Sequence, residues 1–326
     1  MALNLPSSMN PDTETSLLLR VAEYRVAAEQ VIELILARAD DGPLPAWAPG
    51  AHIDLILANG LVRQYSLAGN PADRLRWRLG ILRERDSRGG SEFIHTSLSP
   101  GDELRARGPR NHFELVSARR YVFIAGGIGI TPLLPMIARV HEAGADWSLL
   151  YGGRMQASMA FCEELTRYGS RVALRPEDQF GLLDLKSALG TPHDDTAIYC
   201  CGPEPLIAAV EASSGHWPAG SLHVERFSAQ PDARAGTAGA FEVELRRSGM
   251  RLMIPPDRSI LEVVTEAGIP VLSSCEDGVC GTCQTTVIEG VPDHRDSLLT
   301  QAEKKAGKTM TLCVSRAVSP CLVLDL

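Results

Sequence analysis

Four cysteines near the carboxyl end constrain this chain more than any other feature. Cys275, Cys280 and Cys283 follow one another closely and Cys313 comes much later, which gives the spacing C-x4-C-x2-C-x29-C. Thiolates are soft ligands that suit transition metals, so one loop with three sulfurs and a distant fourth predict a metal or cluster site. Gly278 lies inside that loop, where a glycine lets the backbone approach the sulfurs closely.

The first intervals match the plant-type ferredoxin spacing for a 2Fe-2S cluster. Zinc is the alternative metal, but structural zinc sites usually present two close pairs of ligands, and Cys280 with Cys283 is the one such pair here. Disulfides are disfavoured, since 8 cysteines in 326 residues are too dilute for a disulfide scaffold. Cys162, Cys200 and Cys321 lack a comparable spacing and are interpreted as small buried apolar residues.

Length and charge limit the kind of protein. A chain of 326 residues exceeds one hydrophobic core, so two or three domains are expected. The formal charge of -8 argues against a general nucleic-acid binder. The most apolar early run, 31–37, is too short to span a membrane, and the amino terminus lacks the pattern of a signal peptide. We expect a cytoplasmic monomer that acts without nucleic acid or membrane.

The pattern of residues 1–115 predicts an antiparallel β domain that is closed as a barrel. Asn59-Gly60 separates two apolar runs and indicates a hairpin, because both residues tolerate the positive φ of a tight turn. Apolar residues alternate with arginine or glycine from Leu75 to Ile81, as in a strand with one buried face. A short helix is expected after Ser91, whose hydroxyl would cap it.

The rest of the chain divides into two further domains and a linker. Residues 116–228 alternate apolar strands, glycine turns and amphipathic helices, which predicts a parallel, Rossmann-like α/β domain. Residues 229–240 are small and aperiodic and indicate a linker. Residues 241–326 combine short strands with capping boxes at Ser259 and Thr300, and form the α+β module that holds the four cysteines.

Two stretches of the first domain suit a flavin. The stretch RQYSL begins at Arg63 on the second hairpin strand, and SRGGSEFIH, from Ser87 to His95, opens the short helix. Together they offer an aromatic ring, a hydroxyl group, arginines and a helix amino terminus, and the last two favour a phosphate. Alone, RQYSL is equally explained by a strand with an exposed arginine and a packed tyrosine.

Taken together, these segments resemble the phthalate dioxygenase reductase family, a branch of the ferredoxin-NADP reductase superfamily. The matching elements are RQYS, SRGGS, GGIGITP, CGPEPL, ERF and the four cysteines, in that order from Arg63 onward. The resemblance implies an FMN-binding β-barrel domain over 1–115, an NAD-binding domain over 116–228 and a plant-type ferredoxin domain with a β-grasp fold over 241–326.

The resemblance also implies roles for residues of the flavin domain. Arg63 would pair with the FMN phosphate, Tyr65 would pack against the flavin ring, and Ser66 would approach flavin N5 as a catalytic residue. Phe227 would cover the ring from the end of the middle domain. The remaining phosphate-binding residues would be Arg83, Arg88, Gly89, Gly90 and Ser91. These arginines suit the terminal monophosphate of FMN better than the pyrophosphate of FAD.

The GGIGITP turn lies between a predicted strand and a helix. Glycines there let backbone N–H groups reach a pyrophosphate where the helix dipole favours negative charge, although the turn is not the G-x-G-x-x-G fingerprint. With CGPEPL, the resemblance implies a pyridine nucleotide site with Cys201 as a second catalytic residue, at the nicotinamide. The other binding residues would be Gly126, Gly127, Gly129, Thr131, Pro132, Gly202 and Pro203. Arg154 alone makes no clamp for a 2′-phosphate, which favours NADH over NADPH.

A hydride carries two electrons, whereas an iron-sulfur cluster accepts one at a time, so a flavin is needed between them. The resemblance therefore implies an oxidoreductase that passes electrons from NADH through FMN and the cluster to a separate protein. That protein would be the Rieske-type non-haem iron oxygenase of an aromatic or quaternary-amine oxygenase or demethylase system. Two alternatives stay open: a stand-alone flavin diaphorase with a non-essential cluster, and a zinc-stapled binding module.

Overall fold

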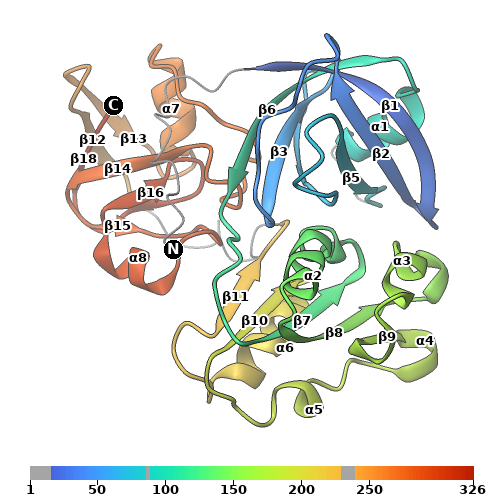
Figure 1. Ribbon diagram of the computed structural model, residues 1–326. Helices are drawn as coiled ribbons and strands as arrows, with labels where there is room; N and C mark the ends of the chain where they lie inside the picture. Colours follow the sequence, from blue (N-terminus) through green and yellow to red (C-terminus); the bar gives the residue numbers. More distant parts are fainter. Residues whose placement is uncertain (1–15, 86–88, 229–238) are drawn as a thin grey trace.

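The computed structural model of the chain describes residues 16–85, 89–228 and 239–326, which form three units (Figure 1). The predicted phosphate-binding Arg88 and most of the predicted linker lie outside the described residues. Each unit is built on its own sheet, and the sheets follow one another along the chain in the predicted order. None of the helices in the described ranges is long and apolar enough to cross a membrane.

The first unit is an antiparallel sheet with the strand order β4-β3-β6-β1-β2-β5. Its elements are β1 (Leu17–Ala28), β2 (Val31–Arg38), β3 (Ala51–Ile56), β4 (Val62–Ser66), β5 (Trp77–Leu82), α1 (Gly90–Ser97) and β6 (Glu103–Asn111). A bridge between Leu67 and Leu79 brings the two edges of the sheet together, and fully buried side chains such as Ile53 and Trp77 fill the interior. The predicted β-barrel is confirmed.

Two local predictions for this unit are wrong. Leu75 precedes β5 and is 59% exposed, because the Asp73 carboxylate accepts hydrogen bonds from the N–H groups of Leu75 and Arg76 and holds the segment in a turn. Ser91 does not cap α1, which is preceded by Gly89 in the left-handed conformation. The Ser91 hydroxyl instead accepts a hydrogen bond from the N–H of Glu84 at 3.1 Å.

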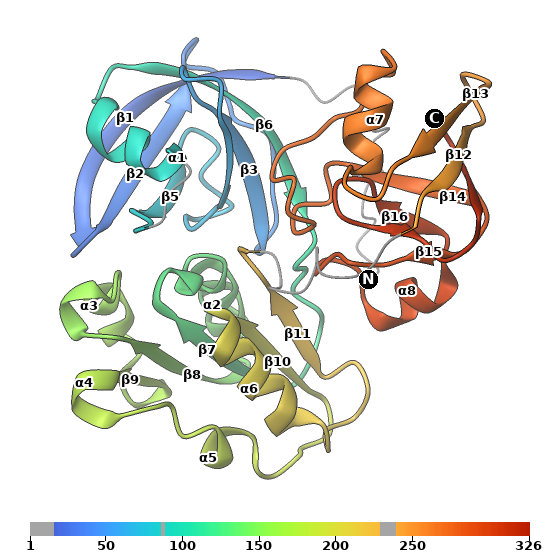
Figure 2. The same ribbon diagram turned by 180° about the vertical axis from the view of Figure 1, so that it is seen from behind.

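The second unit is a parallel sheet with the order β11-β10-β7-β8-β9 (Figure 2). Its strands are β7 (Arg120–Gly126), β8 (Asp146–Gly153), β9 (Val172–Pro176), β10 (Thr196–Cys201) and β11 (Leu222–Glu225). Its helices are η2 (Gly127–Ile130), α2 (Leu133–Glu142), η3 (Gln156–Ser158), α3 (Cys162–Thr166), η4 (Gly169–Arg171), α4 (Glu177–Phe180), α5 (Leu185–Leu189) and α6 (Glu204–Ser214). The parallel pairing confirms the predicted Rossmann-like α/β fold. Of the cysteines interpreted as buried, Cys200 is fully buried, whereas Cys162 and Cys321 are half-buried.

The third unit is a mixed sheet with the order β13-β12-β18-β14-β16, in which β12 and β18 are parallel. Its strands are β12 (Phe241–Leu245), β13 (Met250–Ile254), β14 (Gln284–Glu289), β16 (Thr309–Thr311) and β18 (Cys321–Leu324). A separate two-stranded sheet is formed by β15 (Pro292–Asp293) and β17 (Arg316–Ala317). Both capping boxes are present, at Ser259 before α7 (Ile260–Glu266) and at Thr300 before α8 (Gln301–Ala306). This is the predicted β-grasp arrangement. In both views β3 and β6 are the barrel strands nearest to this unit (Figures 1 and 2).

Candidate functional site

The four predicted cluster ligands come together as two pairs. Side-chain hydrogen bonding links Cys275 with Cys280 and Cys283 with Cys313, and charge interactions also link Cys280 with Cys283 and Cys275 with Cys313. A 2Fe-2S cluster bound by four cysteines takes two sulfurs on each iron, so this grouping fits such a cluster.

In each pair the surroundings favour the thiolate form of one sulfur, that of Cys280 or Cys283, whereas the pKa of its partner, Cys275 or Cys313, is raised. The hydrogen bond from Cys275 lowers the pKa of Cys280 to about 6, and the hydrogen bond from Cys313 lowers the pKa of Cys283. The backbone N–H of Thr282 also donates to the Cys280 sulfur at 3.4 Å. Hydrogen bonds to ligand sulfurs stabilise their negative charge and tune a bound cluster.

Two glycines allow the cysteine loop, residues 273–283, to pack tightly. Gly278 and Gly281 both have φ in the left-handed region, at 71° and 73°. A Cβ on Gly278 would stand 2.5 Å from Cγ2 of Val314, and one on Gly281 would stand 2.8 Å from Nε2 of His112. His112 directly follows β6, so the cysteine loop lies against the barrel.

Strand β4 and helix α1 bring several predicted flavin residues together. A Cβ on Gly90 would stand 2.4 Å from Nε of Arg63, so the guanidinium side chain crosses the first turn of α1. No side chain in the described ranges caps this turn, whose N-cap is Gly89. Ser91 lies in the same turn. A guanidinium group beside an uncapped helix amino terminus is suited to bind a phosphate.

The other predicted flavin residues are placed differently. Burial raises the pKa of Tyr65 above its usual value, which keeps the side chain a neutral phenol. Ser66 is buried and ends β4. Arg83 is exposed and makes two contacts of 2.6 Å with the carboxylate of Glu92 on α1. Phe227 follows β11 and is 44% exposed.

The predicted nucleotide residues meet where β7 and β10 end side by side. A Cβ on Gly126 would stand 2.6 Å from Cδ of Pro203, and one on Gly129 would stand 2.2 Å from the carbonyl oxygen of Cys201. The GGIGITP and CGPEPL segments are therefore in direct backbone contact. Burial raises the pKa of the Cys201 thiol well above its usual value, so the side chain is a neutral thiol.

Thr131 joins the nucleotide turn to the barrel. Its side chain is 2% exposed, and its hydroxyl donates to the carbonyl oxygen of Ile128 at 2.9 Å. A Cβ on Gly80 of β5 would stand 2.7 Å from Cγ2 of Thr131 and 3.0 Å from the ring of Phe161. The absence of a side chain at Gly80 thus lets the second unit approach β5.

Glu225 is a candidate site residue that the sequence argument missed. It pairs with Cys201 across β10 and β11, and burial raises the pKa of its carboxyl to about 8. Oε2 of Glu225 is buried without a hydrogen-bond partner among the described atoms. The available signal was the ERF segment, which places a carboxylate two residues before the predicted Phe227, at the end of a short strand.

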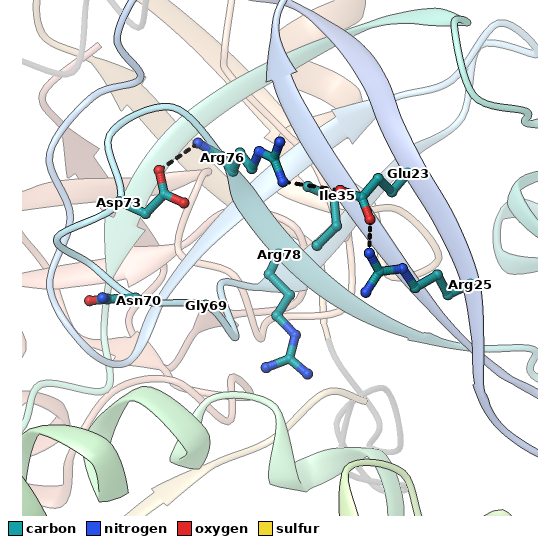
Figure 3. Close-up of a pocket in the computed structure, with 8 residues that line it drawn as sticks. All are labelled: Glu23, Arg25, Ile35, Gly69, Asn70, Asp73, Arg76 and Arg78. Atoms are coloured by element: carbon teal, nitrogen blue, oxygen red, sulfur yellow. Dashed lines mark hydrogen bonds and ion pairs between the residues drawn. The ribbon is translucent and has the colours of Figure 1, made fainter. Parts of the chain in front are cut away.

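A pocket on the β2 and β5 face of the barrel is lined by charged side chains that pair with one another (Figure 3). Nη1 of Arg76 lies 3.0 Å from Oε1 of Glu23. Arg78 points away toward the second unit, where it lies 2.8 Å from Glu164 and 4.5 Å from the ring centre of Phe161. The pocket contains none of the predicted site residues, and Arg78 instead closes the seam between the two units.

Family comparisons match two of the three units. The 2Fe-2S iron-sulfur cluster binding domain matches residues 243–318, and the oxidoreductase NAD-binding domain matches residues 123–212. The phenoxybenzoate dioxygenase subunit beta of Ectopseudomonas oleovorans is 42% identical over 94% of this chain and 97% of its own length.

Solved structures match almost the whole chain. A phthalate dioxygenase reductase, described as a modular structure for electron transfer from pyridine nucleotides to [2Fe-2S], is 37% identical with a TM-score of 0.72 and covers 98% of this chain and 100% of its own. An intact type IV self-sufficient cytochrome P450 monooxygenase is 42% identical with a TM-score of 0.88. That match covers 95% of this chain but 41% of the longer monooxygenase.

Proposed function

Because this chain belongs to the phthalate dioxygenase reductase family, an oxidoreductase family, we propose that it passes electrons from NADH through FMN and a 2Fe-2S cluster to a Rieske-type oxygenase. One observation carries the proposal: β3 lies between β4, which bears the flavin residues, and β6, whose end contacts the cysteine loop. Neighbouring strands are about 4.8 Å apart, so β4 and β6 are separated by about 10 Å.

The barrel is proposed to bind and orient FMN. Arg63 and the first turn of α1 hold the phosphate, and Ser91 in that turn supplies a hydroxyl group for it. Tyr65 covers the flavin ring, and Ser66 lies at N5. When bound, FMN accepts electrons in a pair and releases them one at a time, which suits a one-electron cluster.

The second unit is proposed to present the nicotinamide to the barrel. Gly126 and Gly129 let the GGIGITP turn close against CGPEPL, and Gly127, with open space beside it, is the position at which the backbone would meet the pyrophosphate. Cys201 stands at the nicotinamide as a neutral thiol. Gly80 and Thr131 bring this turn against β5. The contact fixes the distance between the two halves of the hydride-transfer site and excludes water from it.

NADH is the proposed donor. Arg154 directly follows β8 and is exposed, so a single cation stands where a 2′-phosphate would be recognised. Arg175 at the end of β9 stacks on Phe180, 4.8 Å from the ring centre. A higher kcat/KM for NADH than for NADPH is expected.

The third unit is proposed to hold the cluster and to deliver electrons to the oxygenase. Cys275 and Cys280 would bind one iron, and Cys283 and Cys313 would bind the other. Of the three similar proteins described above, two are named for dioxygenases and one for a cytochrome P450 monooxygenase. The two dioxygenase names favour a Rieske-type acceptor.

Quantification of flavin, iron and sulfide, followed by anaerobic titration with NADH, tests the proposal. We expect one FMN, two irons and two sulfides for each chain, bleaching of the flavin and a rhombic electron paramagnetic resonance signal from reduced iron. A colourless protein that contains zinc would contradict the proposal. Transfer to a purified Rieske oxygenase and to a cytochrome P450 haem domain, measured side by side, would identify the class of acceptor.

A further inference from the structure

An ion cluster is buried between the barrel and the third unit. It consists of Asp54 on β3 and of Arg107 and Arg110 on β6, and we call it the Asp54 cluster. Oδ1 of Asp54 lies 2.6 Å from Nη2 of Arg110, and Oδ2 lies 3.5 Å from Nη2 of Arg107. The Asp54 side chain is completely buried. Burial of charged side chains costs free energy, so the Asp54 cluster needs hydrogen-bond partners from the third unit as well.

The partners are the two residues that precede the first cysteine ligand. The hydroxyl of Ser274 donates to Oδ1 of Asp54 at 3.0 Å, and Nη2 of Arg107 donates to the carbonyl oxygen of Ser273 at 3.0 Å. Ser274 is adjacent to Cys275 in the chain. The Asp54 cluster therefore holds the cysteine loop at its beginning by two hydrogen bonds.

A second contact holds the other end of the same loop. Gly281, between Cys280 and Cys283, lies against the ring of His112, which directly follows β6. The ring centres of His112 and of the buried His52 on β3 are 5.7 Å apart. The loop is thus held on both sides of its first two ligands by residues of the β3 and β6 strand pair, or directly after it.

The same strand pair is joined to the flavin strand. Across β3 and β4, His52 pairs with Ser66 and Asp54 pairs with Gln64. Side chains two residues apart on a strand point to the same face, so the face that meets the cysteine loop also carries Ser66. Ser66 is the residue proposed to lie at flavin N5. A rigid sheet, rather than a flexible tether, therefore links the flavin position to the cysteine loop.

We propose that Asp54 is a positioning residue, which fixes the cysteine loop at the distance from the flavin strand that rapid electron transfer requires. The inference rests on the proposed function of the chain. Asp54 acts through Ser274 and touches neither cofactor. Removal of the Asp54 carboxylate or of the Ser274 hydroxyl breaks the hydrogen bond that holds the start of the loop. Removal of the carboxylate also takes from Arg107 and Arg110 the anion with which both pair.

The test compares four variants of the full chain loaded with FMN and cluster. Asp54→Asn weakens the ion pairs of the Asp54 cluster. Ser274→Ala removes the hydroxyl that bonds to Asp54, and Ser274→Thr keeps a hydroxyl there. Ser273→Ala is the matched control, because Ser273 contacts Arg107 through its backbone carbonyl. Stopped-flow spectroscopy measures cluster reduction after mixing with NADH, and amide hydrogen exchange measures protection of the cysteine loop.

We expect Asp54→Asn and Ser274→Ala to slow cluster reduction by about tenfold or more, because misplacement of reacting groups by about 1 Å can cost up to about 100-fold. Hydrogen exchange in the loop should rise in both variants. Flavin reduction, iron content and NADH-ferricyanide activity should stay unchanged, and Ser274→Thr and Ser273→Ala should behave as the wild type does.

Wild-type rates and exchange in Ser274→Ala would overturn the proposal. The proposal would also be overturned if cluster reduction slowed only because iron was lost or because the flavin itself was reduced slowly. The Asp54 cluster would then act on cluster assembly or on the flavin step, and not on the position of the loop. If the wild-type chain itself does not reduce its cluster with NADH, the proposed function fails. The exchange comparison then decides separately whether the Asp54 cluster holds the loop.

Discussion

The carbonyl oxygen of Cys201 lies so close to Gly129 that a Cβ on the glycine would stand 2.2 Å from it. This contact joins the turn after β7 to the end of β10 and leaves no room for any other residue at position 129. It also explains why GGIGITP and CGPEPL act together, since each needs the backbone of the other.

Gly129→Ala is expected to lower kcat/KM for NADH by at least about tenfold, because a misplacement of about 1 Å at a reacting centre costs this much or more. FMN content should be unchanged, since the barrel is not altered. NADH-ferricyanide kinetics and flavin quantification measure the two effects. Gly215→Ala is the control, with an ordinary backbone conformation and its nearest atom 4.0 Å away. Normal kinetics in Gly129→Ala would argue that the nucleotide binds elsewhere.

Gly80→Ala should separate the barrel from the second unit without loss of FMN. The new methyl group would meet Cγ2 of Thr131 at 2.7 Å and the ring of Phe161 at 3.0 Å. The rate of flavin reduction by NADH, followed by stopped-flow absorbance, should fall while FMN stays bound. Gly42→Ala is the control, since its neighbours are flexible exposed side chains. An unchanged reduction rate would show that the seam does not set the hydride-transfer distance.

Arg63→Ala should weaken FMN binding by about tenfold or more, because a hydrogen bond to a charged group contributes about 1.5 to 3 kcal/mol. Quenching of FMN fluorescence by the flavin-free protein gives the Kd. Arg20→Ala is the matched control, because Arg20 is an exposed barrel arginine that pairs with Asp41. Equal FMN affinity in both variants would remove Arg63 from the phosphate site.

Glu225 makes stability depend on pH in a defined direction. Burial raises the pKa of its carboxyl to about 8, from 4.5 in the ordinary state. Between these values the folded chain holds a proton that the unfolded chain has released, so folding stability falls as pH rises, by up to about 1.4 kcal/mol per pH unit. Below the lower value both states are protonated and the effect vanishes.

Glu225→Gln should remove this fall of folding stability with rising pH, because an amide does not ionise. The gain in unfolding free energy over the wild type should grow from about pH 5 to about pH 8, where the unfolded carboxyl is ionised. Urea unfolding across this range measures it. A constant difference between the two proteins would mean that Glu225 is ionised in the folded chain.

Cys283→Ser should separate the two electron-transfer activities. With one ligand lost, NADH-cytochrome c reduction, which needs the cluster, should be abolished, while NADH-ferricyanide reduction through FMN persists. Cys321→Ser is the control, since Cys321 belongs to neither sulfur pair and contacts Glu242. Cytochrome c reduction that survives in Cys283→Ser would favour the stand-alone diaphorase.

Local patterns determined most of the fold. The strand alternation, the glycine turns and the two capping boxes involve neighbours in the chain, so their geometry can be predicted from short segments. The errors at Leu75 and Ser91 arose where a local prediction competed with another hydrogen bond. The Asp73 carboxylate holds Leu75 in a turn, and the Ser91 hydroxyl turns to Glu84 instead of capping its own helix.

By itself, the sequence determined that this chain carries a four-cysteine cluster motif, a glycine-rich nucleotide turn and a flavin strand in a fixed order, because each motif is written in residues close together. The tertiary structure alone decided how the cysteine sulfurs are grouped and that Oε2 of Glu225 is buried on the strand beside Cys201. It also brought Asp54 against Ser274, which is 220 residues away in the chain. The Asp54–Ser274 contact joins surfaces of different units, and no periodicity or spacing within either segment records which surface the other will meet.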